Sequence, residues 1–212
     1  MTGKWYLVRH GETNWNDQGR IQGHTDVPLN DGGRQQISLL AERLAGHSFS
    51  AVYASDLSRA TESARVLIGC RRLAIHTDAD LREFDYGRWE GLTVRQAEEE
   101  NPRVFEELIR SGDEGFAAPG GENTGQLLER VGRFCERMSR RHDADEDLLI
   151  VAHAGSIRAL MLCLLELDKA DFWRFGVDPT SLSAISNHPG GRVLELWNDT
   201  SHLAFAGRAG GE

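Results

Sequence analysis

Short apolar segments that end directly in a polar motif constrain the fold of this chain more than any other feature. The segment from Trp5 to Val8 runs straight into Arg9-His10-Gly11, and the segment from Leu148 to Ala152 runs into His153-Ala154-Gly155. An apolar run of this length, bounded by polar residues, is typical of a parallel strand that is covered on both faces. Two further pairs follow the same pattern: Ala51 to Ala54 before Ser55-Asp56-Leu57-Ser58-Arg59, and Leu73 to His76 before Leu81-Arg82-Glu83.

Helical patterns separate these segments, as expected for an α/β fold. Asp56 is the expected cap of a helix that carries Arg59 in its first turn. Three more helices are expected from Asn30 to a stop at Gly46, from Thr93 to Arg110 with a break at Pro102, and along the amphipathic stretch from Leu127 to Met138. The last predicted elements are a helix from Ile157 to Leu165 and closing strands at Leu182 to Ser186 and Val193 to Trp197.

This order of elements predicts an α/β fold of three layers, an α/β/α sandwich. Its central sheet is expected to be mostly parallel, with helices on both faces. A chain of 212 residues is long enough for one substantial core. We expect residues 1–206 to form a single domain and residues 207–212, which are rich in glycine, to be a disordered tail.

Composition excludes several classes of partner. The net charge of -9 argues against nucleic acid and anionic membranes, because both favour a basic face. No segment approaches the run of about 20 apolar residues that spans a bilayer. The amino-terminal residues lack the pattern of an export signal, so the cytoplasm is the expected location. Cys70, Cys135 and Cys163 are odd in number and show no CxxC spacing, so we expect small core residues in a reducing compartment.

The polar motifs that follow the strands are expected to meet in one pocket. In an open α/β sheet, ligands bind beyond the carboxyl ends of the strands, where such loops converge. The candidate catalytic residues are therefore His10, Glu83, His153, Arg9 and Arg59. Two histidines, two arginines and a carboxylate suit phosphoryl chemistry without a metal.

Each of these residues also has an ordinary structural interpretation. Arg59 alone could pair on a helix surface with Glu62, and Glu83 alone would usually be a solvated carboxylate. His153 alone is more often a hydrogen-bonded core histidine than a catalyst. Four motifs at equivalent strand ends favour a shared functional site over these separate explanations.

The remaining histidines show no ligand pattern. His24 is a weaker candidate for contact with a substrate, and the others are expected on the surface: His47, His76, His142, His188 and His202. We expect no metal and no cofactor, because the chain has neither an HExxH motif nor paired CxxC motifs. The arginines expected beside His10 and His153 would also repel a cation.

These motifs together resemble the histidine phosphatase superfamily, in the branch that includes cofactor-dependent phosphoglycerate mutases. The similarity begins at Leu7-Val8-Arg9-His10-Gly11-Glu12-Thr13-Asn14-Trp15-Asn16 and spans nearly the whole chain. It includes Gln22-Gly23, Ser55 to Ala60, Leu81 to Glu83, Gly87, Trp89-Glu90-Gly91, Pro119-Gly120-Gly121-Glu122 and Val151 to Gly155.

The resemblance implies a mechanism through a phosphorylated histidine. By this correspondence His10 is the nucleophile, Glu83 is the proton donor, and Arg9, Arg59 and His153 surround the phosphate. The implied substrate-binding residues are Asn16, Gln22, Gly23 and Ala154. Ala154 is a departure, since relatives commonly carry glycine there, but alanine is small enough that we expect little effect.

Elementary chemistry supports the same roles. Phosphoryl transfer develops charge on the phosphate oxygens, so catalysis depends mainly on positioning and electrostatic stabilisation. His10 must attack as a neutral imidazole, and neighbouring guanidinium groups disfavour its protonation. Because an alkoxide leaves poorly, a carboxylic acid such as Glu83 is needed to protonate it and then to deprotonate the attacking water.

These considerations favour a metal-independent hydrolase of a small phosphomonoester, acting as a monomer or homodimer. Mutases of this family typically carry an inserted basic segment, whereas between Glu83 and Pro119 this chain has no lysine and has an acidic run at Glu98-Glu99-Glu100. The basic residues there are Arg88, Arg95, Arg103 and Arg110. A cofactor-dependent phosphoglycerate mutase, a non-catalytic phosphate-binding module and a metal-dependent hydrolase stay open as alternatives.

Overall fold

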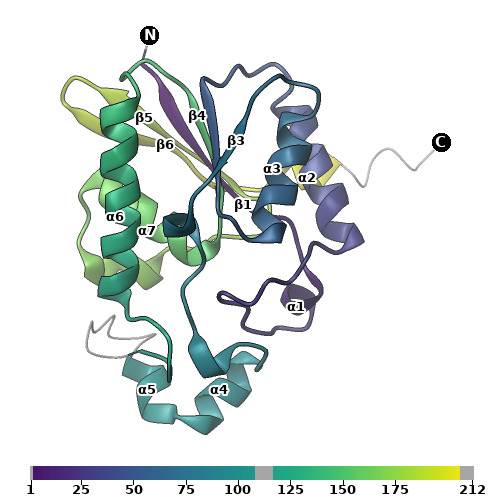
Figure 1. The fold of residues 1–212 in the computed structure, drawn as a ribbon, viewed down its shortest axis with the longest axis vertical. Helices are drawn as coiled ribbons and strands as arrows, with labels where there is room; N and C mark the ends of the chain where they lie inside the picture. Colours follow the sequence, from purple (N-terminus) through teal and green to yellow (C-terminus); the bar gives the residue numbers. More distant parts are fainter. Residues whose placement is uncertain (1, 108–116, 206–212) are drawn as a thin grey trace.

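The structure, a computed structural model, describes residues 2–107 and 117–205 and contains a six-stranded sheet (Figure 1). The strand order is β3-β2-β4-β1-β5-β6, and within the described residues only β5 runs against the other strands. The strands are β1 (Lys4–Arg9), β2 (Ala51–Ala54), β3 (Ile75–Thr77), β4 (Leu148–Ala152), β5 (Leu182–His188) and β6 (Gly191–Asp199). The predicted mostly parallel sheet is confirmed.

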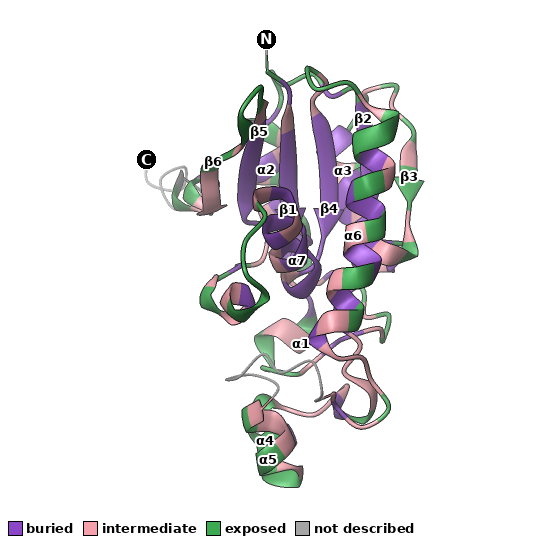
Figure 2. Ribbon diagram, turned by 90° about the vertical axis from the view of Figure 1, so that its left-hand side faces the viewer, coloured by how far each residue is buried: buried purple, intermediate pink, exposed green. Residues whose placement is uncertain are grey.

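Helices cover both faces of this sheet. Helices α2 and α3 lie on one side and α6 and α7 on the other, as Figure 1 shows. The helices are α1 (Asn14–Asp17), α2 (Asp31–Arg43), α3 (Ser58–Ile68), α4 (Val94–Glu100), α5 (Pro102–Glu106), α6 (Thr124–Arg141) and α7 (Ala154–Leu165). The short pair α4 and α5 lies beyond the carboxyl ends of the strands (Figures 1 and 2).

The alternation of side chains along β4 explains the three layers. Leu149 and Val151 point into the core beneath α2 and α3, whereas Leu148 and Ile150 point into the core beneath α6 and α7. All four side chains are fully buried, and Figure 2 shows the central strands buried over most of their length. Successive residues of a strand face opposite sides of a sheet, so an uninterrupted apolar run can fill two cores.

The start of α3 differs from the prediction. Asp56 does not cap this helix, because its carboxylate accepts two hydrogen bonds from the Arg82 guanidinium, at 2.7 and 2.5 Å. The N-cap is Leu57, and the carboxylate of Asp26 accepts the Ser58 amide hydrogen at 2.8 Å instead. A residue from a distant loop thus supplies the oxygen that was expected from the helix's own sequence.

Other boundaries are close to those predicted. The expected break at Pro102 separates α4 from α5, since a proline begins a helix more readily than it continues one. The third strand lies at Ile75–Thr77, two residues later than its predicted start. The predicted helix end at 108–110 and the predicted tail at 207–212 fall outside the described residues.

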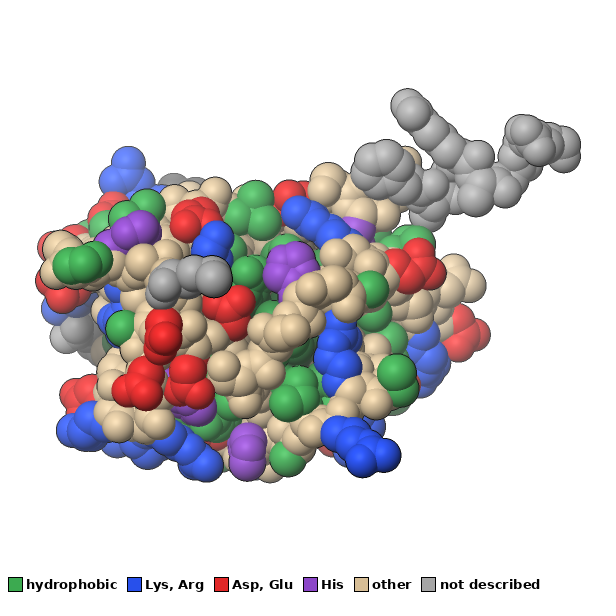
Figure 3. Space-filling model, turned by 90° about the horizontal axis from the view of Figure 1, so that it is seen from above, with side chains coloured by type: hydrophobic (Ala, Val, Ile, Leu, Met, Phe, Trp, Pro, Cys, Tyr) green, Lys and Arg blue, Asp and Glu red, His purple; other side chains and the backbone are tan. Residues whose placement is uncertain are grey.

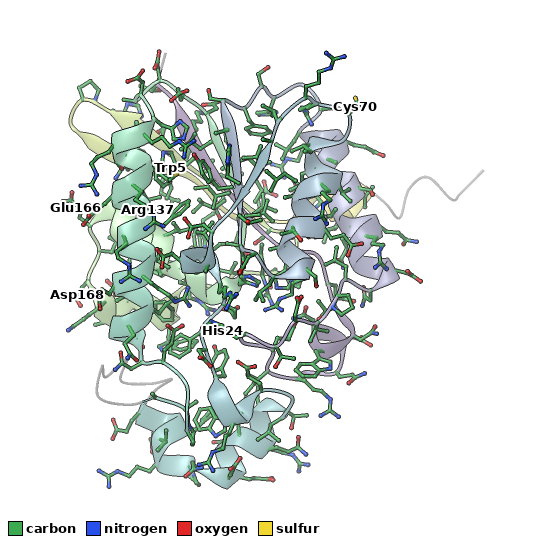
Figure 4. The ribbon with its side chains drawn as sticks, viewed as in Figure 1. Trp5, His24, Cys70, Arg137, Glu166 and Asp168 are labelled. Atoms are coloured by element: carbon green, nitrogen blue, oxygen red, sulfur yellow. The ribbon has the colours of Figure 1, made fainter. Side chains whose placement is uncertain are left out.

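The cysteine prediction is partly wrong. Cys135 is buried, Cys163 is half-buried and Cys70 is exposed just beyond α3, where Figure 4 labels it. The surface at the amino-terminal end of the strands, seen in Figure 3, mixes acidic and basic side chains over the area in view. No helix in the described parts of the chain combines the length and the apolar character needed to cross a membrane.

Candidate active site

A cavity of about 260 Å³ opens at the carboxyl ends of the central strands. Parallel pairing places the end of β1 beside the end of β4, so Arg9 lies opposite Ala152 in the sheet register. His10 and His153 follow directly, and their ring centroids are 4.9 Å apart. All the predicted site residues except His153 line the cavity: Arg9, His10, Asn16, Gln22, Gly23, Arg59, Glu83 and Ala154.

His10 presents one ring nitrogen to this cavity. Its Nδ1 lies 2.7 Å from the Gly11 carbonyl oxygen, which can only accept, so Nδ1 carries the hydrogen and Nε2 keeps a free lone pair. Burial, followed by the charges of Arg59 and Arg9, holds the pKa of His10 well below its usual value. The imidazole is therefore neutral and nucleophilic at Nε2.

His153 lies beside His10 and is fully buried. The Nε of Arg59 donates to its Nδ1 at 3.2 Å, which leaves the ring hydrogen on Nε2. Burial and then the charge of Arg59 lower the pKa of His153, so this ring is a neutral donor. The buried Nε2 has no hydrogen-bond partner among the described residues, and a phosphate oxygen would satisfy it.

The two arginines are held by backbone carbonyls. Arg59 donates to the Thr25 and Gly23 carbonyl oxygens at 2.8 and 2.7 Å, and burial lowers its pKa to about 10. Arg9 donates to the Val177 oxygen at 2.6 Å, while its buried Nε lacks a partner within the described chain. Both guanidinium groups remain charged at neutral pH and retain free N–H groups, which suits an anion.

Glu83 is held by backbone amides. Its Oε1 accepts hydrogen bonds of 2.8 Å from the amides of Phe84 and Gly155. A Cβ at position 155 would lie 2.4 Å from this oxygen, so only glycine allows the carboxylate to approach the start of α7. With Oε1 committed in this way, Oε2 is the oxygen that can exchange a proton with a ligand.

The loop between β1 and α2 supplies the other predicted residues. Asn16 accepts from the Thr13 backbone amide in a capping box of α1, and Gly23 contributes its carbonyl to Arg59. His24, labelled in Figure 4, is not among the described residues that line the cavity. Its Nε2 donates to the Glu83 carbonyl oxygen at 2.9 Å.

Sequence reasoning missed several residues that line the cavity: Gly19, Arg20, Ile21, Tyr86 and Val94. Arg20 and Ile21 directly precede the predicted Gln22-Gly23 pair, and Tyr86 follows Glu83 by three residues, so proximity in sequence was an available signal. Val94 begins α4, a helix that reaches the cavity only through the fold, and no local pattern identifies it.

Two histidines predicted on the surface are not exposed. His202 is buried, with its Nε2 lying 3.3 Å from the Thr180 hydroxyl. His142 is half-buried, and its ring bridges the Tyr53 hydroxyl and the Glu146 carboxylate, each at 2.8 Å. Both positions depend on contacts with distant segments of the chain.

A metal centre finds no support in the described part of the chain. Within residues 2–107 and 117–205, no three His, Cys, Asp or Glu side chains are grouped so that they could hold a metal ion. The charges that act most strongly on His10 are the guanidinium groups of Arg59 and Arg9. This arrangement attracts anions.

A family model for the histidine phosphatase superfamily (branch 1) matches residues 5–200. The chain belongs to the histidine phosphatase superfamily. The resemblance of its motifs to this family and the α/β/α fold expected from them are therefore both confirmed.

Individual relatives within this superfamily cover almost the whole chain. Phosphoglycerate mutase-like protein 4 of Arabidopsis thaliana is 35% identical over 95% of this chain and 87% of its own length. Phosphoserine phosphatase 1 of Hydrogenobacter thermophilus is 32% identical over 94% of both chains. A phosphoserine phosphatase of Entamoeba histolytica, solved in complex with phosphoserine, superposes with a TM-score of 0.85 at 26% identity, over 95% of this chain and 99% of its own.

Proposed function

We propose that this protein is a metal-independent phosphatase of small phosphomonoesters that acts through a phosphohistidine on His10. One observation supports this function above all: the free Nε2 of a neutral His10 shares a cavity with two guanidinium groups and with a carboxylate held by backbone amides. Nucleophile, charge stabilisation and acid are the components that phosphoryl transfer requires.

In the first step, His10 Nε2 attacks phosphorus and a P–N bond forms as the P–O bond to the leaving group breaks. Glu83 gives the proton on its Oε2 to the departing oxygen, so an alcohol leaves and Glu83 becomes a carboxylate. Arg9 and Arg59 bind the phosphate oxygens, and His153 donates its Nε2 hydrogen to one of them.

In the second step, the Glu83 carboxylate accepts a proton from water while the water oxygen attacks phosphorus. The P–N bond breaks, inorganic phosphate leaves, and both His10 and Glu83 return to their starting protonation states. The same carboxyl group therefore serves as acid and then as base.

The substrate class we favour is a small phosphorylated alcohol such as phosphoserine. Two of the relatives are named phosphoserine phosphatases, and a cavity of about 260 Å³ suits a metabolite of this size. A cytoplasmic location, a single domain over residues 1–206 and a monomeric or homodimeric state stay predictions.

A second candidate is phosphoglycerate mutase activity, since another relative bears a mutase-like name. In the described part of the segment that should bind a second anionic group, acidic residues accompany the arginines. Arg95 pairs with Glu99 at 3.7 Å on α4, beside an acidic run at Glu98-Glu99-Glu100. Hydrolysis is therefore the better supported outcome.

The test is a panel of phosphomonoesters, including phosphoserine and p-nitrophenyl phosphate, assayed with chelator present, with 3-phosphoglycerate isomerisation measured alongside. We expect hydrolysis that is insensitive to chelator. His10→Ala should abolish it, whereas His76→Ala, an exposed histidine of β3, should not. Activity that requires added metal, or isomerisation faster than hydrolysis, would contradict the proposal.

A further inference from the structure

We propose that Arg130 is a positioning residue that holds the loop bearing Glu83 in its proton-transfer geometry. This inference rests on the proposed function, since it concerns the acid of that reaction. Arg130 belongs to α6, is 9% exposed and does not line the described cavity. Its hydrogen bonds reach the reaction through the loop that bears Glu83, and its charge adds to the lowering of the His153 pKa that burial and Arg59 cause.

The Arg130 guanidinium binds three backbone carbonyl oxygens before and at the acid. Its Nη1 donates to the carbonyl oxygens of Asp80 and Arg82, at 2.9 and 2.8 Å. Its Nη2 donates to the carbonyl oxygen of Glu83 itself at 2.7 Å. These bonds join residues 47 to 50 positions apart in the sequence.

Glu122 completes the arrangement from the Pro119-Gly120-Gly121-Glu122 turn. Its carboxylate accepts from Nε and Nη2 of Arg130, at 3.0 and 2.5 Å. The same carboxylate accepts from the Asp85 amide at 2.9 Å, and the Glu122 amide donates to the Asp85 carbonyl at 3.0 Å. The loop is thus held on both sides of Glu83.

All five N–H groups of Arg130 have a partner, which uses the full donor capacity of a guanidinium. A lysine ammonium has three donors on a single atom and could not reach these acceptors together. The side chain of Glu83 must also remain within 2.8 Å of the Gly155 amide. A shift of the loop by about 1 Å would lengthen the proton-transfer distance, to which such reactions are sensitive.

The test compares two leaving groups in Arg130→Met and wild type. An alkyl ester such as phosphoserine needs a proton on its leaving oxygen, whereas 2,4-dinitrophenyl phosphate releases a stable anion and does not. We measure kcat/KM, because it covers only steps up to release of the leaving group. The matched control is Arg133→Met, one turn along the same helix, whose side chain is 52% exposed and contacts the carboxylates of Asp80 and Glu129.

For Arg130→Met we expect a loss of kcat/KM of roughly 10²-fold with phosphoserine and less than about threefold with the dinitrophenyl ester, as for the loss of a general acid. Competitive inhibition by inorganic phosphate should stay unchanged, since Arg9 and Arg59 are intact. In a Glu83→Gln background, Arg130→Met should cause little further loss. Arg133→Met should leave both substrates unaffected.

Equal losses with the two esters in a folded Arg130→Met variant, or losses that add to those of Glu83→Gln, would overturn the inference. If circular dichroism shows that Arg130→Met is unfolded, Glu122→Gln is tested instead. We then expect a smaller loss of kcat/KM, which is again greater with phosphoserine than with the dinitrophenyl ester. A wild type that hydrolyses neither ester would instead contradict the proposed function, so the two failures are distinguishable.

Discussion

The Nε of Arg59 donates a hydrogen bond of 3.2 Å to Nδ1 of His153, and this contact determines which nitrogen of the ring carries hydrogen. A guanidinium cannot accept, so His153 Nδ1 must be unprotonated and its Nε2 is the donor. Burial and then the charge of Arg59 lower the pKa of His153 and keep the ring neutral, and its Nε2 hydrogen has no acceptor among the described protein residues.

Arg59→Lys should therefore keep the local positive charge but lose hydrogen bonds that only a guanidinium can make together. A single ammonium cannot donate to His153 Nδ1 and to the carbonyls of Gly23 and Thr25 together. We expect kcat/KM to fall roughly 10²-fold, and the free energy of unfolding to fall by about 1–3 kcal/mol through unsatisfied buried acceptors. Steady-state kinetics and urea unfolding measure the two effects, with Arg65→Lys on the same helix as control. Unchanged inhibition by phosphate in Arg59→Lys would contradict this role.

His10 and His153 should resist protonation. Their pKa values lie well below the usual value of about 6.5, first because both are buried and then because Arg59 is near. In imidazole NMR spectra, both rings should still be neutral at pH 6.5. Since neutral His10 is the nucleophile, kcat should persist at this pH. If either ring were half protonated at pH 6.5, burial and the charge of Arg59 would not lower its pKa as argued.

The same pKa shifts predict how stability depends on pH. Below about pH 6.5 the unfolded chain protonates these histidines, whereas the folded protein keeps them neutral, so the unfolded state binds more protons and stability falls as pH falls. Burial also lowers the pKa of His202, which adds to the trend. Urea unfolding between pH 7.5 and 5.5 should show this decline, and it should be shallower in His10→Ala. An equal slope in both proteins would contradict the assignment.

Gly155→Ala should disable the acid without disturbing phosphate binding. The new Cβ would lie 2.4 Å from Glu83 Oε1 and would displace the carboxylate from the Gly155 amide. We expect a loss in kcat of roughly 10²-fold with alkyl phosphates, as for a misplaced general acid. Gly132→Ala is the control, because a Cβ there meets no described atom within 4 Å apart from its chain neighbours and the backbone of its own helix, and alanine favours the helix by about 1 kcal/mol. A normal kcat in Gly155→Ala would contradict the claim that the acid requires a close approach of the Glu83 carboxylate to the Gly155 amide.

Local signals in the sequence located much of the site. The apolar runs before His10 and His153 indicate parallel strands, and the strand order of the sheet then places these two strands side by side and brings the residues after them together. For the same reason Arg59, at the start of a helix after β2, could be assigned to the pocket from sequence. These predictions needed only the spacing of apolar residues along the sequence and the parallel direction of the strands.

Features that depend on distant contacts were not accessible in this way. The cap expected from Asp56 failed because Arg82, 26 residues away, binds its carboxylate. Arg130 gave no signal, since a helical arginine is ordinarily solvated and its burial here depends on the loop at 80–85. His202 is likewise buried only because the segment after β6 packs against Thr180.

The central claim is that phosphorus becomes bonded to His10 during turnover. Rapid-quench experiments with ³²P-labelled substrate, followed by peptide mapping, test it most directly. We predict an acid-labile label on His10 that forms and decays fast enough to account for turnover, and that is absent in His10→Ala. Label on another residue, label that persists in His10→Ala, or turnover without any labelled protein would contradict the account.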